Sequence, residues 1–138
     1  MSADSVRISR KSDFTRTLSR GVRVSARDLS VHVARVPPRW PDDSAVRPDV
    51  AMTGGPWLGL IISKRVGNAV VRHRTARRLR HAFAATAPDL LGAETFVVIR
   101  AHPGVVERSS TELADTLREA FGHRKVAASR DRATAVSR

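Results

Sequence analysis

The spacing of apolar residues changes along this 138-residue chain, and each change predicts a different element. In KSDFTRTLSRG, Phe14 and Leu18 stand four residues apart, which places both on one face of a helix. Ser12 suits the cap of this helix, and Gly21 suits the position just after its end. We therefore expect a short helix over residues 13–20.

Apolar and polar residues alternate in VRVSARDLSVHVARV, with an interruption at the expected turn or bulge, and alternation is typical of strands with one buried face. The valines and Leu29 fall on one side, whereas His32 points to the other. The pattern predicts two short strands or one interrupted strand. The mostly apolar stretches WLGLIIS, from Trp57, and ETFVVIRA, from Glu94, predict two further strands.

A second helix is expected after Gly67, where Asn68 can serve as its cap. It should end near Thr86, because the residue before Pro88 is disfavoured in the helical conformation. Its apolar side comprises Val71, Thr75, Leu79, Ala82 and Phe83.

The last helix is expected after Ser109, which has capping-box spacing to Glu112. Helices that interrupt a small sheet in this order predict a single α+β domain. Between the second and third strands, five prolines and the lack of an apolar period predict a long loop insertion. The expected segments are a flexible arm (1–8), a folded domain (9–125) with its insertion (37–56), and a disordered basic tail (126–138).

The composition is strongly basic, with 25 Lys and Arg against 13 Asp and Glu and a net charge of +12. This balance places nucleic acid first among the expected partners, ahead of an anionic membrane surface. The absence of cysteine excludes disulfides and thiolate metal sites. We expect a cytoplasmic protein, because the chain shows neither a signal peptide nor a segment of membrane-spanning length.

Residues 63–81, SKRVGNAVVRHRTARRLRH, concentrate the positive charge without one acidic residue. Arg78 lies at the border of the apolar side of the helix, and Arg72 falls on the apolar side near the helix start. Like charges three or four residues apart destabilise an isolated helix, so this arrangement predicts a polyanionic partner. The cationic side comprises His73, Arg74, Arg77, Arg80 and His81.

The surroundings of this helix indicate a phosphate site and favour RNA over DNA. The helix start, beside Lys64 and Arg65, presents free backbone N–H groups that suit a phosphate. A helix that reads DNA in a helix-turn-helix needs a partner helix shortly before it, whereas a strand precedes this one. Recognition of RNA through its shape and phosphates fits better.

The titratable residues argue against catalysis by the protein itself. A protein ribonuclease needs a positioned acid and base, or clustered carboxylates for metal ions. Only His73 and His81 share a face, two helical turns apart among arginines, and the closest acidic pair, Asp42 and Asp43, lies in the proline-rich loop. No zinc or Walker-type spacing occurs.

The run GLIISKRVGNAVVRHRTARRLRHAF, residues 59–83, closely resembles the signature of the bacterial ribonuclease P protein subunit. The resemblance extends to SDFTRTLSRG, like the family's first helix, and to ETFVVIRA, like its last strand. It implies an α+β domain in the order α-β-β-β-α-β-α, with a four-stranded sheet and a left-handed βαβ crossover at the basic helix. That handedness runs against the general rule, so it rests on the resemblance alone.

The resemblance also implies a ribonucleoprotein enzyme. In this family the ribonuclease P RNA carries the catalytic centre, with Mg²⁺ bound mainly by RNA, and the complex removes the 5′ leader of precursor tRNA. The protein stabilises the RNA fold, strengthens substrate binding and lowers the magnesium requirement. The implied partners are therefore ribonuclease P RNA and precursor tRNA, with no membrane and no obligate protein partner.

Two groups of residues carry over by position. The group implied to contact ribonuclease P RNA is Lys64, Arg65, Asn68, Arg72, His73, Arg74, Arg77, Arg78 and Arg80. The group implied to line a leader-binding cleft, between the first helix and the sheet, is Phe14, Leu18 and His32. Leu18 and His32 stand where the family often has aromatic residues. His73 replaces a common Asn, and Ala76 replaces a frequent Lys.

Two other classes stay open on the sequence alone. A ribosomal or other structural RNA-binding protein would also be basic, as would a DNA-binding helix protein. Basicity is all that favours them, whereas the uninterrupted SKRVGNAVVRHR favours a ribonuclease P subunit.

Overall fold

The computed structural model describes residues 7–35, 54–92 and 94–128. The order of its elements confirms the predicted α+β domain and adds one short 3₁₀-helix, η3, that the apolar pattern did not predict. The elements are α1 (Lys11–Arg20), β1 (Val22–Ala26), β2 (Leu29–Arg35), β3 (Trp57–Ile62), α2 (Ala69–Leu90), β4 (Thr95–Ala101), η3 (Pro103–Glu107) and α3 (Ser110–Phe121).

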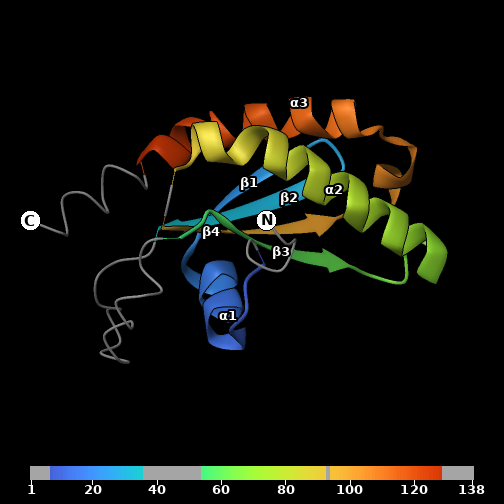
Figure 1. Cartoon of the computed structure of the whole chain (residues 1–138), viewed down its shortest axis with the longest axis horizontal. Coiled ribbons are helices and arrows are strands. Elements are labelled where there is room, and N and C mark those ends of the chain that lie inside the picture. The colour runs from blue at the N-terminus through green and yellow to red at the C-terminus, as the bar shows by residue number, and fades with distance from the viewer. Residues whose placement is uncertain (1–6, 36–53, 93, 129–138) are drawn as a thin grey trace, which may run out of the picture.

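The four strands form one mixed sheet in the order β1-β2-β4-β3, so that β3 lies at an edge. The β1–β2 and β2–β4 pairs are antiparallel, whereas β3 and β4 are parallel neighbours joined through α2. Figure 1 shows α2 and α3 together on one face of the sheet and α1 against the other. The basic helix therefore starts where β3 ends and runs back across the sheet.

Strand alternation decides which side chains reach each layer. Leu29, Val31 and Val33 of β2 and Ile99 of β4 are fully buried in the core, which they share with apolar residues of α2 and α3. His32 points to the opposite face of the sheet, where α1 packs, as the alternation predicted. The two short strands are separate, joined by a turn at residues 27–28.

α1 begins two residues earlier than predicted, and its N-cap is Arg10 rather than Ser12. The side chain of Arg10 makes no capping hydrogen bond, so contacts with the sheet decide where the helix starts. The N–H of Ile8 donates to the C=O of Leu58 at 3.0 Å, and Arg7 forms a parallel bridge with Leu58. The expected flexible arm is thus attached to β3 at its last two residues, and the first six lie outside the described residues.

Phe14 and Leu18 share one side of α1, as predicted, but both are only half-buried. The buried residues of this helix are Asp13 and Thr17, and the hydroxyl of Thr17 donates to the C=O of Asp13 at 2.8 Å. The ring of Phe14 packs on Gly59 of β3, where a Cβ would lie 2.5 Å from Phe14 Cε2. Glycine at this position therefore lets α1 approach the sheet.

α2 ends at Leu90, one turn beyond the predicted end near Thr86. Pro88 is an exposed residue of the last turn, and its missing N–H removes one hydrogen bond. Ala87 and Leu91 on either side are fully buried, and the N–H of Leu91 donates to the C=O of Ala87 at 2.8 Å. Packing of this turn on the core outweighs the conformational preference of the residue before proline.

The C-terminal boundary of the domain also differs from the prediction. Residues 124–128 are helical, and Val126 is only 2% exposed because it packs into the core. The domain therefore includes the start of the segment expected to be a disordered tail, and the residues after this turn lie outside the described part. Most of the proline-rich insertion lies outside it as well.

The contact between Phe14 and Gly59 generates a prediction about stability. Gly59→Ala should lower the free energy of unfolding by about 1–3 kcal/mol, because the new methyl group overlaps the ring. In a protein that already carries Phe14→Ala, Gly59→Ala should lower the free energy of unfolding much less, because the ring is absent. Urea denaturation of the two single variants and the double variant measures this coupling, and additive effects would contradict the contact.

Candidate RNA-binding site

The start of α2 is shaped by the loop after β3. Val66 is buried and anchors this loop to the core. At Gly67 a Cβ would lie 2.8 Å from the Cβ of Val71, so a side chain there would obstruct the entry into the helix. The side chain of Asn68 accepts a hydrogen bond from the N–H of Val71 at 3.0 Å, which confirms the predicted cap.

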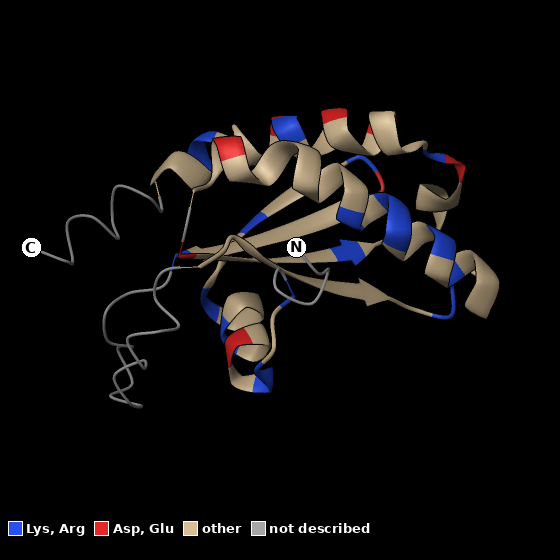
Figure 2. Ribbon diagram, viewed as in Figure 1, with Lys and Arg blue, Asp and Glu red and all other residues tan. Residues whose placement is uncertain are grey.

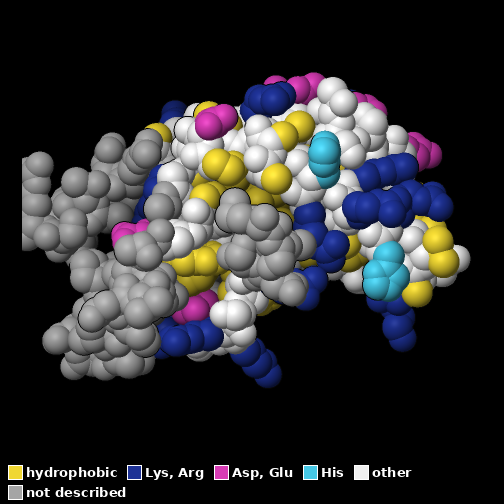
Figure 3. All heavy atoms as spheres, in the orientation of Figure 1, with side chains coloured by type: hydrophobic (Ala, Val, Ile, Leu, Met, Phe, Trp, Pro, Cys, Tyr) yellow, Lys and Arg dark blue, Asp and Glu magenta, His cyan; other side chains and the backbone are white. Residues whose placement is uncertain are grey.

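Lys and Arg positions gather around this helix start and along the first half of α2 (Figure 2). In the described part of the chain none of the exposed ones forms an ion pair, whereas acidic residues lie along α3 (Figures 2 and 3). We call the exposed set the cationic face; it comprises Lys64, Arg65, His73, Arg74, Arg77 and His81.

The buried side of α2 holds these like charges together. Leu79 and Phe83 are buried, and the ring of Phe83 meets that of Phe121 in α3 edge to face, with centroids 6.3 Å apart. Burial of one such side chain contributes about 1.5–3 kcal/mol. Each like-charge pair along a helix costs only about 0.2–0.5 kcal/mol. Packing therefore maintains a face that the isolated helix would not.

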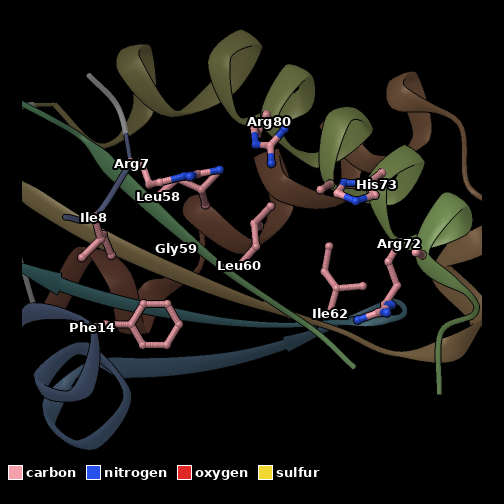
Figure 4. Close-up of a pocket in the computed structure, with 12 residues that line it drawn as sticks. Arg7, Ile8, Phe14, Leu58, Gly59, Leu60, Ile62, Arg72, His73 and Arg80 are labelled. Carbon is pink, nitrogen blue, oxygen red and sulfur yellow. The ribbon is translucent and has the colours of Figure 1, made fainter. Parts of the chain in front are cut away.

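Three arginines predicted to contact RNA, Arg72, Arg78 and Arg80, are half-buried rather than exposed on the cationic face. Arg78 is half-buried, and its Nη1 donates to the C=O of Val106 at 3.3 Å and of Arg108 at 3.2 Å. These bonds tie α2 to the segment before α3. Arg72 is also half-buried and lies over Ile62 of β3 rather than on the cationic face (Figure 4).

Arg72, His73 and Arg80 line a groove of about 430 Å³ between α2 and the edge of β3 (Figure 4). Phe14 of α1 lines the same groove, and so does Arg7, just before α1. The structure thus brings three residues predicted to contact ribonuclease P RNA together with one predicted to contact the leader. Leu18 and His32 are not among the residues that line it.

His32 lies instead on the α1 face of the sheet, between two arginines on neighbouring strands. In the strand register Arg23 stands opposite His32, and Arg100 stands opposite Ser30. His32 is 9% exposed, and its Nδ1 is buried with no hydrogen-bond partner among the described residues. Burial lowers the pKa of His32, and the charges of Arg23 and Arg100 lower it further.

Sequence reasoning missed three cations beside these predicted sites: Arg7, Arg23 and Arg100. In VRVSA, Arg23 stands between two valines and therefore points to the other face of the sheet. This is the face of His32, so the alternation of the sequence could have identified Arg23. Arg7 gave no such signal, because its position depends on a backbone contact with a strand some fifty residues away.

The described residues do not assemble a metal-binding or membrane-spanning feature. Within the described ranges, no three His, Asp or Glu side chains cluster in a way that could hold a metal ion. Nor does any helix in this part of the chain have the length and apolarity needed to cross a bilayer.

The lowered pKa of His32 predicts a pH dependence of stability. The unfolded chain takes up a proton near the ordinary pKa of about 6.5, whereas the folded protein resists it, so stability falls as pH drops below that value. His32→Leu removes this loss. The difference in unfolding free energy between wild type and variant, measured in urea from pH 7.5 to 5, should shift in favour of the variant at low pH. A difference that stays constant would contradict the assignment.

Known proteins resemble this chain along most of its length. The family model described as Ribonuclease P matches residues 3–125. The ribonuclease P protein component of Nocardia farcinica is 47% identical over 120 residues, covering 81% of this chain and 76% of that protein. The corresponding protein of Rhodococcus jostii is 45% identical over 112 residues, covering 81% and 82%.

Solved structures share the fold at lower identity. The ribonuclease P protein of Staphylococcus aureus superposes with a TM-score of 0.64 at 21% identity, covering 88% of this chain and 96% of that one. That of Thermotoga maritima gives 0.62 at 13% identity, covering 83% and 94%. Fold, helix-start motif and family match agree, and the chain belongs to the ribonuclease P protein family.

Proposed function

We propose that this protein is the protein subunit of ribonuclease P and acts with a catalytic RNA to remove the 5′ leader of precursor tRNA. The observation that carries the proposal is the cationic face at the start of α2, built on the motif that identifies the family. A positively charged surface whose cations form no ion pairs with the protein's own carboxylates suits a phosphate backbone. A cytoplasmic location follows from the substrate, since bacterial tRNA precursors are made there.

The chemistry belongs to the RNA in this proposal. The implied Mg²⁺ does not fit the protein's own residues, because the described part of the chain offers no cluster of metal-ligating side chains. What the protein supplies is positive charge. Neutralising phosphates that must approach one another lowers the concentration of magnesium the folded RNA needs.

The α1 face of the sheet is the proposed contact for the leader. His32 stands between Arg23 and Arg100 on this face, and the half-buried Phe14 and Leu18 are the apolar side chains that α1 contributes. Single-stranded RNA is bound by rings that stack on bases and by cations that hold the backbone. The arrangement offers both, with fewer aromatic rings than the family commonly has.

The cationic face predicts how assembly with RNA depends on salt. The double variant Arg74→Ala/Arg77→Ala should weaken binding to ribonuclease P RNA and make the slope of log affinity against log salt shallower by about 1.4–1.8, because two phosphate contacts are lost. The matched control is Arg124→Ala/Lys125→Ala, which removes the same charge from exposed positions after the end of α3. Equal slopes for the two double variants would contradict the proposed face.

Reconstitution tests the function itself. The full-length protein is combined with the ribonuclease P RNA of its own organism and a precursor tRNA, at a magnesium concentration too low for the RNA alone. We expect cleavage at the mature 5′ end that requires both components. Tight binding of the RNA without stimulated cleavage would contradict the proposal and leave a structural RNA-binding protein, a class that no observation of this structure favours.

A further inference from the structure

We infer that the groove between α2 and the outer edge of β3 holds one unpaired nucleotide of the ribonuclease P RNA. The inference rests on the proposed function and adds to it a binding site with a stated ligand. The groove is open at the surface and about 430 Å³ in volume. This is near the lower end of the range for small-molecule pockets, roughly 300–1,000 Å³. It suits a single nucleotide rather than a duplex.

The floor of the groove suits the flat face of a base. Leu60 and Ile62 of β3 form its apolar part, and the ring of Phe14 closes one end (Figure 4). Both leucine and isoleucine are only half-buried by the protein itself. An unpaired base stacked on apolar and aromatic side chains would cover them, and bases in a duplex cannot present their faces in this way.

The walls of the groove suit the phosphate. Arg7 from one side and Arg72 and Arg80 from α2 point into it (Figure 4). In the described part of the chain no carboxylate pairs with these three guanidinium groups, and the Nε of Arg72 is buried without a hydrogen-bond partner. Three cations around one cavity repel one another, so an anion between them is favoured.

The edge of β3 adds hydrogen-bonding groups. The C=O of Leu58 points outward, since it accepts from Ile8, and alternation along the strand turns the N–H and C=O of Leu60 to the same side. Pairing to this outer edge in the described residues is limited to the bridge at Leu58. Leu60 therefore offers a donor and an acceptor beside the groove, as a strand edge does for an added strand.

The position of the groove decides which RNA supplies the nucleotide. His73 belongs both to the groove and to the cationic face, and Arg74 follows it directly on α2. An RNA bound along the cationic face can therefore reach the groove while it stays in contact with α2. The proposed leader surface on the α1 face meets the groove only at Phe14, and neither Leu18 nor His32 lines the groove.

Two pairs of full-length variants test the inference. Ala69→Trp places a bulky ring at the mouth of the groove, and its control Val70→Trp places the same ring on the next, 67% exposed residue outside it. Arg7→Ala removes one wall cation, and its control Arg10→Ala removes an exposed charge three residues away that does not line the groove. Circular dichroism and thermal melting verify that all four fold.

The measured quantity is the Kd for ribonuclease P RNA at fixed salt, without substrate. Because stacking of one base is worth about 1–3 kcal/mol, Ala69→Trp should raise this Kd about tenfold relative to Val70→Trp. Arg7→Ala should raise it several-fold relative to Arg10→Ala. Since Arg7 pairs with Leu58 through its backbone, this variant keeps the test valid even if the tryptophan variant fails to fold.

Three results would overturn the inference. Groove variants that match their controls would leave the groove without a nucleotide. Groove variants that keep their affinity for ribonuclease P RNA but no longer favour precursor over mature tRNA would assign the groove to the leader. A wild-type protein that binds ribonuclease P RNA no better than an unrelated RNA would refute the proposed function itself, which the first two results leave intact.

Discussion

The packing of α2 against both the sheet and α3 is the interaction on which the rest of this molecule depends. It holds a helix whose first half carries cations with no acidic residue among them. The energy comes from the other side of the same helix, where Leu79, Ala82 and Phe83 are buried. The residues that stabilise α2 and the residues proposed to bind RNA therefore lie on opposite sides of the same helix. The number of like charges that the helix can carry is limited by the packing energy of its buried side.

The same constraint explains the arrangement around the helix start. A parallel neighbour of β3 can be reached only by crossing the sheet, so α2 must begin at the end of the edge strand. That geometry sets the loop with Lys64 and Arg65 beside the first turn of α2, and among the described residues the outer edge of β3 is bridged only at Leu58. The cationic face and the groove are consequences of one crossover.

The two faces of the sheet have different proposed roles. One face is closed by α2 and α3 and supplies the core, while the other is only partly covered by α1 (Figure 1). On that second face the buried His32 stands between Arg23 and Arg100, and this is the surface proposed for the leader.

The sequence by itself determined the strands and the cationic side of α2, because alternation and helical periodicity are local properties of consecutive residues. It also predicted the Asn68 cap and the capping box of Ser109, which the structure confirms. Only the tertiary structure decided that Arg72 turns into a groove, that α2 continues past Pro88, and that residues 7 and 8 attach to β3. These features depend on contacts between segments far apart in the chain, and such contacts leave no period in the sequence.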